Sequence, residues 1–207
     1  AEGKIDEPRA AAMLDTAYKA GVTYYDTVYF YHQHTGEAFL GRAMKRYPRD
    51  TFYLATKMPM SIVESLDHAK EIFEGQLAAL QTDYVDFYLL HAVNGERWKQ
   101  AQEMGIVDFL LEMQKAGRIR HFGFSFHGSY EEFEMILTAR DWDFCQIQFN
   151  YMDQEIQAGM RGYALAEKLG VPIIVMEPVK GGSLATISDD ITAKFKAAHP
   201  DWSVASW

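Results

Sequence analysis

The sequence predicts an α/β fold of the TIM (β/α)8-barrel type, and three observations lead to that prediction. Strand-like and helix-like segments alternate along the 207 residues, as in chains built from βα units. The strand-like segments are apolar at nearly every position, which is typical of parallel strands covered on both faces. No Gly-x-Gly-x-x-Gly follows any of them, so a barrel is favoured over a Rossmann sheet.

The first half of the chain holds three strand-helix alternations. The predicted strands lie at residues 22–26, 52–57 and 85–91, and the predicted helices at residues 8–19, 37–46 and 62–80. Ala, Met and Leu form one apolar face of the first helix, and Gly21 follows it as a stop signal. The longest helix keeps apolar side chains at helical spacing, at Ile62, Leu66, Ala69, Ile72, Phe73, Leu77 and Leu80.

The second half repeats the pattern. Its predicted strands lie at residues 121–125, 144–149 and 172–176, and its predicted helices at residues 106–116, 131–139, 160–169 and 191–198. Gly117 is placed as the C-terminal stop of the first of these helices. We therefore count about six strands, whereas a closed barrel has eight and roughly 250 residues. We expect one barrel domain over residues 1–207, with about six of eight βα units and with strands missing at both ends.

The composition argues against several classes of protein. The chain is 48% hydrophobic and 24% charged, which is ordinary for a globular chain with a sizeable core. No apolar run approaches the ~20 residues that span a bilayer, and the first residues lack a signal-peptide pattern. The net charge of −9 disfavours binding to nucleic acids and to anionic membranes. The single cysteine, Cys145, allows no internal disulfide, so we expect a cytoplasmic protein.

Four proton-handling side chains lie at or just past the ends of successive strand-like segments. Asp26 ends the first segment, Tyr31 follows in the next loop, Lys57 ends the second segment and His91 ends the third. One such residue alone is usually a solvated or packing residue. In a parallel barrel, however, the C-terminal ends of the strands carry the chemistry, and all four occur there in order. They are the candidate catalytic residues.

These residue types suit the reduction of a carbonyl group, which needs a hydride at carbon and a proton at oxygen. Tyr31 is the expected general acid. Its ordinary pKa near ~10 makes it a poor donor, and the Lys57 ammonium would lower that pKa. Asp26 would keep Lys57 protonated and oriented. His91 would hydrogen-bond to the substrate oxygen as half of an oxyanion hole.

The spacing Asp-Thr-x-x-x-Tyr over Asp26–Tyr31, with Lys57 and His91, resembles the catalytic tetrad of the aldo-keto reductases. Phe-Gly-Phe-Ser-Phe-His and Met-Glu-Pro-Val-Lys-Gly-Gly look closest to the bacterial branch of that family. The resemblance covers nearly the whole chain and implies the same four roles. It implies a carbonyl reductase of small aldehydes or ketones, with NADPH as cofactor and NADH as the alternative.

The resemblance also implies residues that hold the nicotinamide. Ser125 matches the Ser of the family's Gly-x-Ser-Asn turn, while Phe126 replaces the Asn. Gln146 falls where the family places a second carboxamide ligand, and Gln148 is the runner-up, since we expect only one of them to point inward. Met176 stands where the family often has a Tyr stacked on the ring, and Met can pack softly there.

A glycine-rich turn follows the last predicted strand. It comprises Val179, Lys180, Gly181, Gly182 and Ser183, in the place where barrels bind phosphate. Backbone N–H groups and the lysine cation of this turn are candidates for the cofactor pyrophosphate. The expected partners are therefore a nicotinamide cofactor and a small carbonyl substrate.

Two other readings stay open. Barrels often place a nucleophilic lysine at a strand end, so a Schiff-base aldolase or lyase would use Lys57 or Lys180, although Asp26 would keep Lys57 protonated. A non-catalytic, cofactor-sensing regulatory subunit is the other alternative. Metal chemistry is not expected, because no Cys or Glu completes a ligand set with His121 and His127.

Overall fold

A single parallel sheet forms the centre of the computed structural model, which describes residues 4–207. Its strand order is β1-β2-β3-β4-β5-β6, so each strand lies beside the next strand of the chain. The strands are β1 (Tyr24–Asp26), β2 (Tyr53–Met58), β3 (Val85–Val93), β4 (Ile119–Phe126), β5 (Phe144–Gln148) and β6 (Ile173–Met176). The predicted α/β architecture with about six βα units is confirmed.

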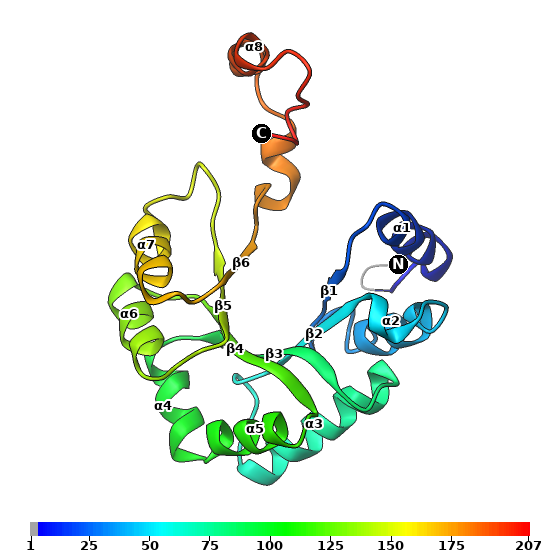
Figure 1. Ribbon diagram of the computed structural model, residues 1–207, viewed down its shortest axis with the longest axis vertical. Coiled ribbons are helices and arrows are strands. Elements are labelled where there is room, and N and C mark those ends of the chain that lie inside the picture. Colours follow the sequence, from blue (N-terminus) through cyan, green and yellow to red (C-terminus); the bar gives the residue numbers. More distant parts are fainter. Residues whose placement is uncertain (1–3) are drawn as a thin grey trace.

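The sheet curves into an arc whose open side lies between β1 and β6 (Figure 1). The α-helices are α1 (Glu7–Lys19), α2 (Gly36–Met44), α3 (Leu66–Leu80), α4 (Gly95–Glu103), α5 (Ile106–Lys115), α6 (Tyr130–Thr138), α7 (Gly159–Leu169) and α8 (Asp189–Ala198). Helices α1 to α7 lie on the convex side of the arc, while α8 lies apart from it (Figure 1). Residues 4–207 also contain two short 3-10 helices, η1 (Arg49–Thr51) and η2 (Lys180–Ala185). Closure into an eight-stranded barrel requires two further strands.

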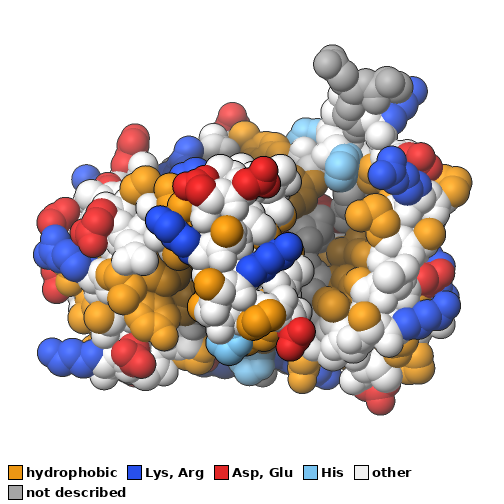
Figure 2. All heavy atoms as spheres, turned by 90° about the horizontal axis from the view of Figure 1, so that it is seen from above, with side chains coloured by type: hydrophobic (Ala, Val, Ile, Leu, Met, Phe, Trp, Pro, Cys, Tyr) orange, Lys and Arg blue, Asp and Glu red, His pale blue; other side chains and the backbone are white. Residues whose placement is uncertain are grey.

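The surface has no large region of one charge on the face seen in Figure 2, where acidic and basic side chains are interspersed with apolar patches. Within residues 4–207, no helix is both long enough and apolar enough to span a bilayer.

Helix α4 is the element that sequence patterns missed. Only Trp98 and Ala101 of its residues are buried, so it lacks a regular apolar stripe. Its start is instead marked by Asn94, whose side chain accepts a hydrogen bond from the Arg97 amide at 2.9 Å. The Asn94 cap is the sequence signal for the start of this helix, but it is hard to recognise because it stands among other polar residues.

A similar cap corrects the start of α3. The Ser65 hydroxyl accepts a hydrogen bond from the amide of His68 at 3.1 Å, so the helix begins at Leu66 rather than at Ile62. Ile62 still packs against the core from the preceding loop. Ile62 is therefore apolar because it is packed against the core, not because it belongs to the helix.

Alternation along the strands separates two apolar layers. One layer lies between the sheet and the helices and contains most buried side chains, such as Phe73, Phe124 and Phe133. The other is small and lies on the concave side, where Ala55, Leu89, Phe144, Tyr24, Phe87 and Ile174 pack together. Lys57 follows Ala55 by two residues and His91 follows Leu89 by two, so both belong to the concave side.

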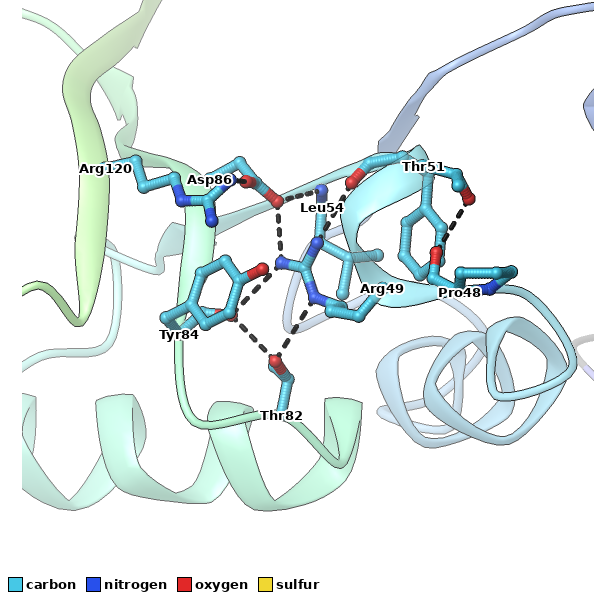
Figure 3. A network of polar contacts seen from close by, with 9 residues as sticks. Pro48, Arg49, Thr51, Leu54, Thr82, Tyr84, Asp86 and Arg120 are labelled. Atoms are coloured by element: carbon cyan, nitrogen blue, oxygen red, sulfur yellow. Dashed lines mark hydrogen bonds and ion pairs between the residues drawn. The ribbon is translucent and has the colours of Figure 1, made fainter.

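A buried carboxylate, Asp86, lies near the start of β3, at the edge of the sheet opposite to Lys57 and His91 (Figure 3). Asp86 accepts from Arg49 at 2.6 Å, from Arg120 at 2.7 Å and from the Leu54 amide at 2.9 Å. Both guanidinium groups also lie over the Tyr84 ring, at 4.2 and 4.3 Å from its centroid. The contacts fully pair the charge, and we assign this cluster a structural role.

Candidate active site

A buried ion pair forms the centre of the candidate site. Lys57, 3% exposed near the end of β2, pairs through Nζ with Asp26 at the end of β1 and donates to the Thr27 carbonyl at 3.0 Å. The second Asp26 carboxylate oxygen accepts from the Tyr24 hydroxyl and from Gln146 Nε2, each at 3.3 Å. Asp26 and Gln146 are 120 residues apart, so the pair joins β1, β2 and β5 across the concave side.

Burial and pairing act on the Lys57 ammonium in opposite directions. Desolvation lowers the Lys57 pKa from its ordinary value, and the Asp26 carboxylate opposes that effect. An ammonium has three N–H donors, of which two point to Asp26 and Thr27. The third has no partner within residues 4–207 and can face a ligand or a neighbouring hydroxyl group.

Tyr31 lies in the turn that follows β1 and is half-exposed. Its amide donates to the Val28 carbonyl at 3.1 Å, and its carbonyl accepts from the Gly36 amide at 3.2 Å. Its hydroxyl makes no hydrogen bond to any residue of the described range 4–207. Burial, then the charges of Asp26 and Glu177, raise the Tyr31 pKa. The net shift of the Tyr31 pKa is therefore upward, opposite to the lowering expected from Lys57.

Tyr29, two residues before Tyr31, has a packing role. Its ring contacts Phe30 and His34 with centroids 5.5 and 4.6 Å away, and it packs against the main core. Tyr31 is therefore the more exposed of these two tyrosines.

His91 sits where the β3–β4 ladder becomes irregular, between Leu90 and Val93. Burial, then the positive charges of Lys57, His127 and Arg97, lower the His91 pKa to about 4. The imidazole is therefore neutral near pH 7 and carries one N–H donor, as the proposed hydrogen bond to a carbonyl oxygen requires.

This pKa predicts how stability depends on pH. Between about pH 4 and 6.5 the unfolded chain binds a proton at His91 that the folded chain does not. The stabilisation is therefore complete above about pH 6.5 and is lost as the pH falls towards 4. After discounting for partial exposure, we expect a loss of about 2–3 kcal/mol. The free energy of unfolding, measured with denaturant across this pH range, should show the loss in the parent and not in His91→Gln. The same dependence of that free energy on pH in both proteins would contradict the prediction.

Two of the predicted nicotinamide ligands, Ser125 and Gln146, are buried and differ in their hydrogen bonding. Ser125 Oγ accepts from the Ala92 amide at 2.8 Å, and its proton remains available for donation. Gln146 is 5% exposed and its Nε2 faces the Asp26 carboxylate, so its Oε1 faces away and has no partner within residues 4–207. Such a buried, unpaired acceptor fits the NH2 group of a carboxamide.

The expectation that only one of Gln146 and Gln148 points inward is wrong. Residues two apart on a strand share a face, so Gln146 and Gln148 point to the same side. They differ in partners instead: Gln148 Nε2 donates to Asp153 at 3.1 Å, and Gln148 Oε1 accepts from Gln157 at 3.0 Å. Met176 is the register partner of Gln148 at the end of β6.

The glycine-rich turn lies at the end of β6, and its lysine is already paired. Lys180 Nζ lies 2.5 Å from the buried carboxylate of Asp153, which also accepts from Asn150 at 2.9 Å. Lys180, Gly181 and Gly182 have φ angles of 48°, 62° and 92°, a left-handed run that glycine adopts readily. Val179 and Ser183 flank this run, and the Ser183 hydroxyl donates to the Lys180 carbonyl at 2.7 Å.

Asp153 is a residue that the sequence reasoning missed. Its only local signal is Asn-Tyr-Met-Asp after β5, where Asn150 Oδ1 accepts from the Met152 and Asp153 amides. That turn is common in loops, so its pairing with Lys180 had no signature of its own. The structure thus brings Lys57 and Gln146 each into contact with Asp26 and places Lys180 in a separate cluster with Asp153.

Comparisons with known proteins agree with this geometry. Residues 1–204 match the model of the aldo/keto reductase family. The chain is 23% identical over 207 residues to a probable aldo-keto reductase 1 of Glycine max, covering 95% of this chain and 58% of that protein. It is 27% identical over 177 residues to the aldo-keto reductase YhdN of Bacillus subtilis, covering 81% and 51%. The chain thus spans about half the length of the curated relatives it matches.

Solved structures show the same fold. The holo form of aldo-keto reductase AKR11C1 from Bacillus halodurans superposes with a TM-score of 0.72 at 27% identity, covering 88% of this chain and 61% of that one. An aldo/keto reductase from Brucella melitensis gives 0.73 at 21% identity, covering 99% and 74%. The family model matches nearly the whole chain and the parallel half-barrel agrees with it, so this chain belongs to the aldo/keto reductase family.

Proposed function

We propose that the protein reduces an aldehyde or ketone to an alcohol with a nicotinamide cofactor. The observation that carries the proposal is the buried Lys57–Asp26 ion pair at the C-terminal ends of β2 and β1, with Tyr31 and neutral His91 nearby. An acid, a neutral donor and a cation at this edge of the sheet suit a carbonyl that becomes an alkoxide.

Each residue then has one role. NAD(P)H, when bound, supplies the hydride. His91 donates its N–H to the carbonyl oxygen and Tyr31 gives its proton to the same oxygen. The raised Tyr31 pKa keeps the phenol protonated over the neutral range. A developing alkoxide is a much stronger base than a phenolate, so the transfer remains downhill. The Lys57 ammonium stabilises the negative charge left on Tyr31, and Asp26 orients the ammonium.

The cofactor would be held by residues of β4, β5 and β6. Ser125 and Gln146 suit the two ends of the carboxamide, since one offers a hydroxyl proton and the other an unpaired oxygen. Met176 would pack on the nicotinamide ring. The turn from Val179 to Ser183 would hold the pyrophosphate, with Lys180 either leaving Asp153 or keeping that pair. We propose NADPH as the cofactor and NADH as the alternative.

Gln146 provides a test of cofactor binding. Gln146→Leu removes the unpaired acceptor, and we expect the Kd for NADPH to rise about tenfold, which corresponds to one hydrogen bond of about 1.4 kcal/mol. Fluorescence titration measures this Kd. Gln148→Leu is the matched control on the same strand face, because Gln148 is engaged with Asp153 and Gln157. A larger effect at Gln148 than at Gln146 would reverse the assignment.

The activity itself is tested by mixing the full-length protein with NADPH and a panel of aldehydes and ketones. We expect cofactor oxidation that depends on the carbonyl compound, with the alcohol as product. Tight cofactor binding without turnover of any carbonyl compound would instead support the regulatory reading. We also propose a cytoplasmic location, because the free Cys145 is buried within β5 and suits a reducing compartment.

One observation favours a second function. Burial lowers the Lys57 pKa, as expected of a lysine that forms a Schiff base. The ion pair with Asp26 argues the other way, because it holds the proton on the amine. Borohydride treatment with a carbonyl substrate decides between them: a covalent adduct at Lys57 would support the aldolase reading and its absence the reductase.

A further inference from the structure

A buried carboxyl group that the proposed reaction does not use lies behind Lys57, on the helix side of the sheet. Glu37, in the first turn of α2, is only 5% exposed. Its Oε1 accepts two hydrogen bonds, one from the Thr56 hydroxyl and one from Gln76 Nε2 at 2.8 Å. Glu37 thereby connects α2 to both β2 and α3.

The contacts continue from Glu37 to the backbone of Lys57. Gln76 Nε2 also donates to the Lys57 carbonyl at 2.9 Å, and Gln76 Oε1 accepts from the Tyr88 hydroxyl at 2.6 Å. Thr56 directly precedes Lys57 on β2. The network therefore fixes the backbone of Lys57 from the helix side, while the Lys57 side chain lies on the concave side with Asp26.

The residue before Glu37 contacts the turn that holds Tyr31. Gly36, the residue before it, donates its amide to the Tyr31 carbonyl at 3.2 Å. A Cβ added at Gly36 would lie 3.2 Å from both the Tyr31 Cβ and the Tyr31 carbonyl oxygen, so α2 begins in close contact with the Tyr31 turn. One short stretch, Gly36–Glu37, thus contacts the loop of the proton donor and the strand of the ammonium.

We propose that Glu37 is a positioning residue that fixes the Tyr31 turn relative to Lys57. This inference rests on the proposed function of those two residues. Hydrogen bonds to a carboxyl oxygen are directional, so they fix the position of α2 along β2. An apolar side chain of the same volume would fill the space without fixing it.

The charge environment of Glu37 agrees with this role. Burial raises the Glu37 pKa, and the hydrogen bonds from Thr56 and Gln76 oppose that effect. The other groups that act on it are Lys57 of β2 and His34 of the preceding turn. Burial, and then the charge of Glu37, raise the pKa of Tyr88 of β3. An oxygen acceptor is needed in either charge state, since Thr56 and Gln76 both donate to it.

The experiment compares three variants of the full-length protein. Glu37→Ala removes the acceptor, and we expect kcat per folded molecule to fall about 10- to 100-fold, the cost of misplacing a catalytic group by about 1 Å. The KM for the cofactor should stay within a few-fold of the parent. Glu37→Gln keeps the oxygen and the size, and should restore most of kcat. Asp86→Asn is the matched control: it weakens a buried carboxylate cluster at the other end of the sheet, so it should lower Tm without lowering kcat.

A second readout is independent of turnover. In protein labelled with 13C-tyrosine, the ring signal of Tyr31 is assigned by its absence in Tyr31→Phe. We expect its titration midpoint to move towards the ordinary value of tyrosine in Glu37→Ala and to stay at the parent value in Glu37→Gln, because a displaced Tyr31 turn is less buried.

An unchanged kcat in Glu37→Ala, a failure of Glu37→Gln to restore it, or an unchanged Tyr31 titration would overturn the inference. If Tyr31→Phe and Lys57→Met retain activity, the proposed function fails separately. The Tyr31 titration then still decides whether Glu37 positions the turn.

Discussion

Replacing Tyr31 by Phe is expected to lower the turnover number for carbonyl reduction about 10²- to 10⁴-fold, the usual cost of losing a general acid. The substitution removes one oxygen from a half-exposed side chain whose hydroxyl makes no hydrogen bond within residues 4–207. The fold and the Kd for NADPH should therefore change little. Because the proton is needed only as the alkoxide forms, the loss should appear in kcat.

Tyr29→Phe is the matched control, since it removes a hydroxyl from the same loop in a ring that packs against the core. Steady-state kinetics with a saturating cofactor compares the two variants. If Tyr31→Phe keeps activity within a few-fold of the parent, Tyr31 is not the proton donor. Loss of activity in Tyr29→Phe alone would move the role to that residue.

Replacing Lys57 by Met is expected to cost at least as much turnover as the tyrosine change. The variant leaves Asp26 without its counter-charge, and the Asp26 charge already raises the Tyr31 pKa. The phenol becomes a weaker acid, and the charge that stabilises its conjugate base is gone. Protonated Tyr31 is the active form, so activity falls as pH rises through the Tyr31 pKa. The high-pH limb of the pH–rate profile should therefore move upwards.

The stability of this variant must be measured as a control. Removing one partner of a buried ion pair costs about 3–5 kcal/mol, so Lys57→Met must be measured below its own Tm. The double variant Asp26→Asn/Lys57→Met removes both charges and should recover much of that stability without recovering kcat. An unchanged high-pH limb in Lys57→Met would show that Lys57 does not tune Tyr31.

The comparison of Glu37 with Lys180 shows why the site was only partly predictable. Lys180 was predicted to hold phosphate because a cation in a glycine-rich turn suits an anion, yet its nearest charge is Asp153, 27 residues earlier. Glu37 has the sequence context of a solvated first-turn residue, yet it is buried against Thr56 and Gln76, 19 and 39 residues later. In both cases the partner comes from another element, which local patterns do not encode.

Local sequence patterns were sufficient to predict the alternation of elements, the parallel sheet and the strand ends at which polar side chains occur. These properties follow from apolar periodicity and stop signals, which depend on neighbours in the chain. Which polar atoms meet follows from the folded arrangement of the elements: Asp26 meets Lys57 and Gln146, and Lys180 meets Asp153. The same arrangement decides that burial raises the Tyr31 pKa and lowers that of His91. Ion pairing and desolvation depend on distances between elements far apart in sequence, so they exist only once the sheet has formed.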